Sequence, residues 1–328
     1  MIEQIWDSES RSGKENFEMI KTDKTTAGAY AGWERYENNP VLPMELGEAF
    51  DATVLKLKDK YRMYFGWRTV RSIAMTESKD GVHWTRPVIC ISPDPSCEWL
   101  QEVNRQIVLV KDGKYHMWFN GQTLGDLGTN GGGSYLCYAS SDDGIQWEMY
   151  PEIIMKADCA WEGYSIMCPH VIWDEEIQMY RMWYSAGEFY EPNAIGYAVS
   201  RDGLHWEKYE GNPVLGANQS NYWEQDRVGG CSIFQAEDWY YMTYIGYEDI
   251  HKAVVCMARS RDGIHWERHK DNPILATGYS GEFDCEAVYK ASVVYDEVNN
   301  QWKLWYNAGT RGIEYIGMAF KNGKDLSF

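Results

Sequence analysis

Ser200-Arg201-Asp202-Gly203-Leu204-His205-Trp206 is the stretch that decides the fold, because its pattern, Ser-x-Asp-Gly-x-x-Trp, occurs four times in the chain. The other copies span Ser78–Trp84, Ser141–Trp147 and Ser260–Trp266. The four tryptophans, at positions 84, 147, 206 and 266, are 63, 59 and 60 residues apart. Repeats of this length made of short strands indicate sheets arranged radially around an axis.

Each repeat reads as four strands. In the third repeat we predict them at His170–Trp173, Tyr180–Ser185, Ala194–Ser200 and Leu204–Lys208. The Asp-Gly pair links the last two, and Asp-Gly between strands is a strong hairpin signal because both residues tolerate positive φ. We expect the Trp that follows to pack between neighbouring sheets, where a large ring buries much apolar area.

A fifth copy of the repeat is split between the two ends of the chain. Trp33-Glu34-Arg35-Tyr36, followed by Asn39-Pro40-Val41-Leu42, matches the segment that begins at Trp206, whereas the last repeat, ending at Gly317–Gly323, lacks its Trp. The sequence therefore predicts an all-β, five-bladed β-propeller with four-stranded blades, closed by an N-terminal strand at Gly28–Leu42. Closure removes exposed sheet edges. We expect one propeller domain over residues 28–328, after a flexible or edge-wrapping arm at residues 1–27.

Composition narrows the classes of partner. The chain has 328 residues, and 49 acidic against 31 basic side chains give a net charge of −18. Such a surface repels nucleic acid and anionic lipid, so we expect neither as a partner. The eight cysteines form no Cys-x-x-Cys pair and read as small buried hydrophobes. The sequence has no leader pattern and no 18-residue apolar run. Together with the unpaired cysteines, this predicts a cytoplasmic location. The oligomeric state is left open.

The first strand of each repeat is predicted to line the axis. The second strands are nearly interchangeable, but the first strands differ most where they begin. One register of the five first strands is occupied by Asp51, Arg105, Cys168, Gly230 and Lys290. Divergence at one end of a repeated scaffold is where we expect a functional site.

Further polar residues lie near this register. Just upstream of the first strands stand Glu48, Glu102, Asp226, Arg227 and Glu286. Trp67-Arg68 follows the second strand of the first repeat, and Glu188-Phe189-Tyr190-Glu191 takes the same place in the third. His170 lies on an axial strand, where a core role and a site role are weighed equally.

Some polar residues recur with the repeat, and we interpret these as structural. They are the aromatic–acid pairs Trp161-Glu162, Trp223-Glu224 and Phe283-Asp284, together with His83, His205 and His265 in the Asp-Gly turns. Repeated positions serve the repeat rather than one site.

The Asp-Gly-x-x-Trp units, the Asn-Pro-Val-Leu runs and strands such as Tyr115-His116-Met117-Trp118-Phe119-Asn120 resemble the five-bladed propeller glycosidases. These are glycoside hydrolase families 43 and 32, with the mannoside-phosphorylase family 130 as a relative. The resemblance covers nearly the whole chain and implies three axial carboxylates. Asp51 matches the first, with Ala52 in place of the family's Pro. Cys168 and Gly229 stand where the resemblance implies an Asp and a Glu.

From these observations we predict a glycoside hydrolase acting on a furanoside or short oligosaccharide, in which one carboxyl protonates the leaving oxygen and another activates water or attacks the sugar. The predicted catalytic residues are Asp51, Asp226 and Glu286. The predicted substrate-binding residues are Glu102, Arg105, His170, Arg227, Lys290, Trp67 and Glu188. Neither a metal nor a cofactor is expected.

Two alternatives stay open at this point. The first is a glycoside phosphorylase, with phosphate bound by Arg105, Arg227 or Lys290. The second is a non-catalytic glycan-binding propeller, favoured by the missing acids at positions 168 and 229. For Asp51 itself, the alternative to catalysis is a residue that caps the strand or pairs with Arg105.

Overall fold

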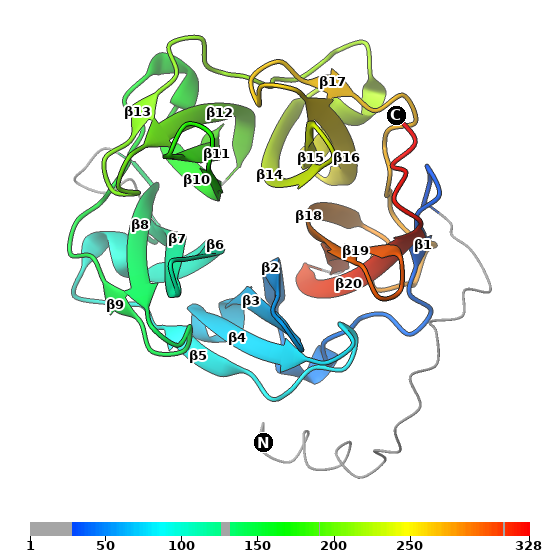
Figure 1. The fold of residues 1–328 in the computed structure, drawn as a ribbon, viewed down its shortest axis with the longest axis horizontal. Helices are drawn as coiled ribbons and strands as arrows, with labels where there is room; N and C mark the ends of the chain where they lie inside the picture. The colour runs from blue at the N-terminus through cyan, green and yellow to red at the C-terminus, as the bar shows by residue number, and fades with distance from the viewer. Residues whose placement is uncertain (1–27, 126–131, 190, 311) are drawn as a thin grey trace.

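The computed structural model describes residues 28–125, 132–189, 191–310 and 312–328. The regular secondary structure of these residues consists of strands and short 3-10 helices, so the all-β prediction is confirmed. The strands form groups of four that stand around a central axis (Figure 1). The arm predicted at residues 1–27 lies outside the described residues.

We number the strand groups 1 to 5 along the chain. Group 1 contains β2 (Ala49–Lys56), β3 (Tyr61–Trp67), β4 (Ser72–Ser78) and β5 (Val88–Ile91). Group 2 contains β6 (Glu102–Lys111), β7 (Lys114–Gln122), β8 (Ser134–Ser141) and β9 (Glu148–Met149). Group 3 contains β10 (Ser165–Asp174), β11 (Met179–Gly187), β12 (Pro192–Ser200) and β13 (Glu207–Lys208). A single parallel pair, Ser134 with Ser165, joins groups 2 and 3.

Group 4 contains β14 (Arg227–Ala236), β15 (Trp239–Asp249), β16 (Lys252–Ser260) and β17 (Glu267–Arg268). Group 5 contains β18 (Ala287–Asp296), β19 (Gln301–Thr310), β20 (Ile313–Asn322) and the N-terminal β1 (Glu34–Arg35). The 3-10 helices are η1 (Met44–Leu46), η2 (Arg68–Val70), η3 (Glu98–Leu100), η4 (Ala160–Glu162) and η5 (Tyr222–Glu224). No helix among the described residues has the length and apolar character that crossing a membrane requires.

The N-terminal segment pairs with the last strand of the chain, as predicted. Glu34 lies opposite Phe320 in an antiparallel ladder. Regular pairing covers only two residues rather than the expected length, although the backbone N–H groups of Tyr36 and Val41 still donate to carbonyls of β20. The chain turns at Glu37 and Asn38 between these two bonds, and Pro40, which follows the turn, has no N–H to continue a ladder.

The Asp-Gly turn is held by its own side chains. In group 3, Asp202 Oδ1 accepts hydrogen bonds from the backbone N–H groups of Leu204 and His205, both at 2.9 Å. These amides are therefore not available to the sheet, which is why β13 begins at Glu207 rather than at the predicted Leu204. His205 Nδ1 lies 2.7 Å from Asp202 Oδ2, and the same contact recurs at His83 and His265, in agreement with a structural role.

The turns also fasten each group to a neighbour. The indole N–H of Trp118 on β7 donates to the Gly203 carbonyl at 2.7 Å, and its ring lies edge-on to Trp206, with centroids 6.3 Å apart. The motif tryptophan therefore packs between sheets, as the sequence predicts. Equivalent bonds join Trp183 to Gly263 and Trp305 to Gly81.

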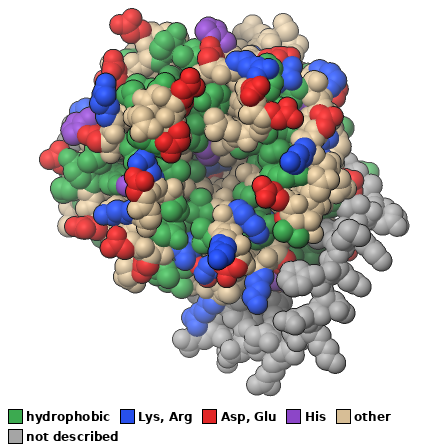
Figure 2. Space-filling model, viewed as in Figure 1, with side chains coloured by type: hydrophobic (Ala, Val, Ile, Leu, Met, Phe, Trp, Pro, Cys, Tyr) green, Lys and Arg blue, Asp and Glu red, His purple; other side chains and the backbone are tan. Residues whose placement is uncertain are grey.

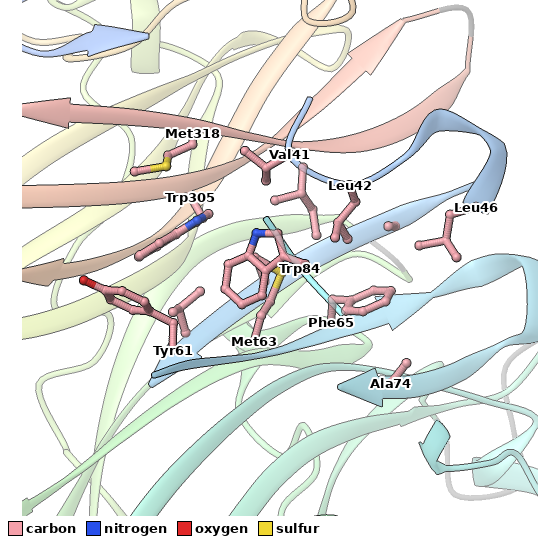
Figure 3. Close-up of a cluster of buried hydrophobic side chains, with 14 of the residues drawn as sticks. Val41, Leu42, Leu46, Tyr61, Met63, Phe65, Ala74, Trp84, Trp305 and Met318 are labelled. Atoms are coloured by element: carbon pink, nitrogen blue, oxygen red, sulfur yellow. The ribbon is translucent and has the colours of Figure 1, made fainter. Parts of the chain in front are cut away.

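The Trp305 bond crosses from group 5 to group 1, and we call this interface the seam. Trp305 and Trp84 lie edge-on to each other, with centroids 6.2 Å apart, within a cluster that also contains Met63 and Phe65 (Figure 3). Trp305 is fully buried. The seam therefore combines apolar burial with a directed hydrogen bond between the two ends of the chain.

The recurring aromatic–acid pairs are structural, as interpreted from the sequence. Buried Glu162 accepts a hydrogen bond from the hydroxyl of Tyr184 at 2.8 Å and pairs with Lys208 at 2.8 Å. The same arrangement of acid, tyrosine and outer-strand cation recurs as Glu224, Tyr244 and Arg268, and as Asp284, Tyr306 and Arg35. Each acid anchors its group, so none is left for chemistry at the axis.

Candidate active site

The five residues aligned from the sequence share one backbone feature. At each of them the first strand slips its register by a β-bulge, and φ is positive. The φ values are 55° at Asp51, 52° at Arg105, 51° at Cys168, 51° at Gly230 and 30° at Lys290. Four of these are not glycine, and a non-glycine residue in this region costs about 1–3 kcal/mol, so the surrounding structure must hold it there. Bulges re-aim side chains, and here they do so on the strands nearest the axis (Figure 1).

Asp51 is held at its bulge from both neighbouring groups. Its backbone N–H donates to Asn307 Oδ1 at 2.8 Å, and Asn307 Nδ2 donates to Asp51 Oδ1 at 2.7 Å. Gln106 Nε2 donates to the Asp51 carbonyl at 2.7 Å. Asp51 and both amide side chains are buried. The carboxylate is therefore fixed in orientation rather than free to rotate.

Two cations face the other oxygen of the carboxylate. Arg105 Nε lies 3.6 Å and Lys290 Nζ 3.7 Å from Asp51 Oδ2. Both distances are those of ion pairs rather than of hydrogen bonds. Lys290 Nζ is buried and has no hydrogen-bond partner among the described residues. The three charged groups therefore lie within ion-pair distance, but neither cation makes a hydrogen bond to the carboxylate.

A cavity of about 500 Å³ opens at the ends where the first strands begin. Asp51, Glu102, Arg105 and Cys168 reach it from first strands. Arg68, Leu124, Glu191 and His251 reach it from the segments that join second to third strands, and Glu314 reaches it from the start of the third strand β20. This volume lies within the range of small-ligand sites. Figure 2 shows one face of the molecule, hollowed near the axis and set with charged side chains of both signs.

Two glutamates in the cavity have perturbed acidity. Burial raises the pKa of Glu191, against the opposing charge of Arg105, and Glu191 is hydrogen-bonded to Tyr247. Burial also raises the pKa of Glu314, against the charge of Arg68. Glu314 pairs with Arg68 Nη2 at 3.0 Å and accepts a hydrogen bond from the Tyr289 hydroxyl. Burial therefore biases both carboxyl groups toward the protonated form, in which a carboxylic acid can donate a proton.

Three of the predicted site residues line the cavity, namely Asp51, Glu102 and Arg105. Lys290 is not in the cavity wall, but its Nζ lies 3.7 Å from Asp51 Oδ2. The others lie elsewhere. Arg227 pairs with Asp226 at 2.6 Å and with Glu188 at 3.9 Å, and none of these three is in the cavity wall. Glu286 is exposed and is not in the wall either.

Trp67 and His170 are buried away from the cavity wall. The Trp67 indole donates to the Leu46 carbonyl at 3.0 Å within the core of group 1, so it is the next residue, Arg68, that reaches the cavity. Burial, aided by the charge of Lys290, lowers the pKa of His170 to about 3, which keeps the ring neutral. Both positions correspond to packing rather than to the predicted contact with substrate.

The sequence-based site did not include Glu314, Tyr247 or Tyr289, and it named Glu191 only as part of a loop. A signal was present, because Glu191 and Glu314 stand where their groups turn from the second strand to the third, as Arg68 does in group 1. Comparing these turns across the repeats, as was done for the first strands, would have found both glutamates.

One group of side chains could hold a metal ion, and it lies apart from the cavity. Among the described residues, the ligand atoms of Asp158, Cys159 and Glu162 lie within 4.8 Å of one another. The ammonium of Lys208 already occupies this place, 2.6 Å from Asp158 Oδ1 and 2.8 Å from Glu162 Oε2. The arrangement is that of a salt bridge rather than of a vacant cation site.

The family model for the glycosyl hydrolases family 32 N-terminal domain matches residues 91–325, which is more than half of the chain. The chain belongs to this family. The resemblance drawn from the repeats is thereby confirmed. A solved structure described as a glycoside hydrolase superposes with a TM-score of 0.68 at 19% identity, over 85% of this family 32 chain and 89% of the other, which shows the likeness of fold.

Curated relatives of this family 32 chain have diverse activities. The A type blood N-acetyl-alpha-D-galactosamine deacetylase of Flavonifractor plautii is 22% identical over 279 residues, or 72% of this chain and 35% of that protein. The 1,2-beta-oligomannan phosphorylase of Thermoanaerobacter sp. (strain X514) is 30% identical over 130 residues, or 36% of this chain and 41% of that protein. The matches span less than half the length of either relative.

Proposed function

We propose that this chain is a glycoside hydrolase in which Asp51 acts as base or nucleophile and Glu191 as general acid. The observation that carries the proposal is that one cavity holds a fixed carboxylate facing two cations and a carboxyl whose pKa is raised by burial. Glycoside cleavage needs this division of labour. In this proposal the five strand groups are the blades of a closed propeller, the substrate is a furanoside or short oligosaccharide, and the enzyme acts in the cytoplasm.

The two glutamates of the cavity are assigned different roles by their partners. Glu314 is bound by Arg68 and by the Tyr289 hydroxyl, and Arg68 also lies over the Phe50 ring, with its Cζ atom 4.4 Å from the centroid. These contacts fit a residue that shapes the wall. Glu191 has no ion pair within 4 Å among the described residues, so its carboxyl can deliver a proton to a bound substrate.

We expect Glu191→Gln to lose most turnover on natural glycosides while retaining turnover on nitrophenyl glycosides, whose leaving groups need little protonation. The expected loss is roughly 10²–10⁴-fold, the usual contribution of general acid catalysis. Turnover of the unmodified enzyme should fall as pH rises through the raised pKa of Glu191, because the ionised form has no proton to donate. Steady-state rates on both substrate types, across pH, measure this.

Glu314→Gln is the matched control, since it also removes a cavity carboxyl. It should change KM more than the dependence on the leaving group. If Glu191→Gln is equally impaired on both substrate types, Glu191 is not the acid. The catalytic roles of Asp226 and Glu286 stay predictions. The same comparison of substrates, applied to variants of these two residues, would then show whether either of them is the general acid.

A screen of nitrophenyl glycosides and oligosaccharides, with and without inorganic phosphate, tests the function as a whole. Turnover without phosphate is the expected result. The relationship to the oligomannan phosphorylase and the position of Arg105 and Lys290 beside Asp51 favour a phosphorylase as the second candidate. Turnover that depends on phosphate would establish it. Binding without turnover in either condition would contradict both and indicate a glycan-binding protein.

A further inference from the structure

The seam places a residue of the last strand group against the carboxylate of the first. Asn307 lies on β19, is fully buried, and makes two hydrogen bonds to Asp51. Asn307 Oδ1 accepts the backbone N–H of Asp51 at the bulge, and Asn307 Nδ2 donates to the carboxylate oxygen Oδ1 of Asp51. The first holds the backbone and the second orients the side chain.

The repeat shows which of these bonds belongs to the scaffold. Asn120 on β7 accepts the bulge N–H of Cys168 at 2.9 Å, and Ser185 on β11 accepts that of Gly230 at 2.8 Å. The side chain of Asn120 makes no hydrogen bond to the Cys168 thiol among the described residues, and Gly230 has no side chain to receive one from Ser185. The amide nitrogen of Asn120 instead donates to Ser134 Oγ and to the carbonyls of Tyr135 and Ile166. The hydrogen bond that accepts the bulge N–H thus occurs in all three pairs. Among these three described pairs, a hydrogen bond to a carboxylate occurs only at Asp51.

We propose that Asn307 is a positioning residue that turns Asp51 Oδ2 toward the reacting centre by occupying Oδ1. This rests on the proposed catalytic role of Asp51. With Oδ1 bound at 2.7 Å, the remaining oxygen faces Arg105 and Lys290, and Asp51 lines the cavity. Oδ2 is therefore the atom that contacts the substrate or its attacking water, and Asn307 determines which oxygen that is.

The first variant is Asn307→Asp, which keeps an acceptor for the bulge N–H and replaces the donor by a second carboxylate oxygen. We expect kcat to fall on the order of 10²-fold with KM little changed, because misplacing a reacting group by about 1 Å costs that much. Asn307→Ser is the second variant. Ser185 accepts the bulge N–H in group 3, so the Asn307→Ser protein should fold. It should lose as much turnover as Asn307→Asp, because serine does not reach the carboxylate of Asp51.

Ser185→Ala is the matched control, because it removes only the scaffold bond at Gly230, which is not in the cavity wall. It should lower the thermal midpoint and leave kcat unchanged. A double-mutant cycle gives the decisive readout: in the Asp51→Asn background, Asn307→Ser should cost no further turnover, because the group that it positions is already inactive.

The outcomes separate this inference from the function on which it rests. If Asp51→Asn keeps wild-type turnover, the catalytic assignment of Asp51 falls. If Asp51→Asn is inactive but both Asn307 variants keep kcat, the assignment stands and Asn307 is merely structural. Equal losses of kcat from Ser185→Ala and Asn307→Ser would also overturn the positioning role, since the scaffold bond alone would account for them.

Discussion

Asp51→Asn is expected to lower turnover by about 10²–10⁴-fold, the range of general acid–base contributions, when rates are expressed per folded molecule. The substitution keeps the shape of the side chain and an oxygen for Asn307, but it removes the charge and basicity at the position that faces Arg105 and Lys290. The measurement is kcat on the substrate identified by the glycoside screen.

Stability is expected to fall as well, which the sequence alone did not indicate. Removing the Asp51 charge leaves two buried cations near each other, and breaking a buried ion pair from one side costs about 3–5 kcal/mol. The double variant Asp51→Asn with Lys290→Met removes one of those cations. It should recover much of the unfolding free energy and none of the turnover. Recovery of turnover in the double variant, or wild-type turnover in the single one, would contradict the catalytic role.

Trp305→Ala is expected to be strongly destabilising. Trp305 is fully buried, packs on Tyr61 and Trp84 with centroids 5.7 and 6.2 Å away, and donates to the Gly81 carbonyl. Replacing a buried Trp by Ala costs about 3–5 kcal/mol. Urea unfolding followed by circular dichroism measures the change.

Trp118→Ala is the matched control, because Trp118 fastens group 2 to group 3 by the same bond to a turn glycine. The two variants should lose similar stability. Only Trp305 lies at the seam with Asn307. Trp305→Ala alone should therefore also lower kcat when the rate is measured at a temperature at which the variant is still folded. A loss of unfolding free energy below about 1 kcal/mol in Trp305→Ala would mean that this ring does not hold the seam. Equal kcat values in the two variants would mean that the seam does not affect the site.

Much of the fold could be predicted because the repeat supplies several views of one structure. The Asp-Gly turns fix the outer hairpins, and the Trp that follows each one lies edge-on to an aromatic ring of a neighbouring group. That ring is a Trp for Trp84, Trp206 and Trp266, and Tyr64 for Trp147. The register of Asp51, Arg105, Cys168, Gly230 and Lys290 also emerged from aligned strands, before any bulge was known. The bulge itself could not be predicted, because Arg, Cys and Lys rarely adopt positive φ.

The site was only partly predictable because its polar contacts join distant segments. Glu314 contacts Tyr289 of its own group and Arg68 across the seam, and no local pattern encodes these contacts. Asp226 stands in the expected place along the chain, but the neighbouring Arg227 binds it at 2.6 Å outside the cavity wall. Sequence position determined which end of the strands carries the site, whereas side-chain pairing determined which acids enter it.

The bond between Asn307 and Asp51 also has a consequence for the order in which the protein is made. The two residues are 256 positions apart, and Asp51 is made before Asn307. At about 5–20 residues per second, a ribosome adds the second roughly 10–50 s after the first. Through that interval the carboxylate exists without the group that orients it. We therefore expect a nascent chain to remain inactive until β19, which carries Asn307, has emerged from the ribosome and docked against β2.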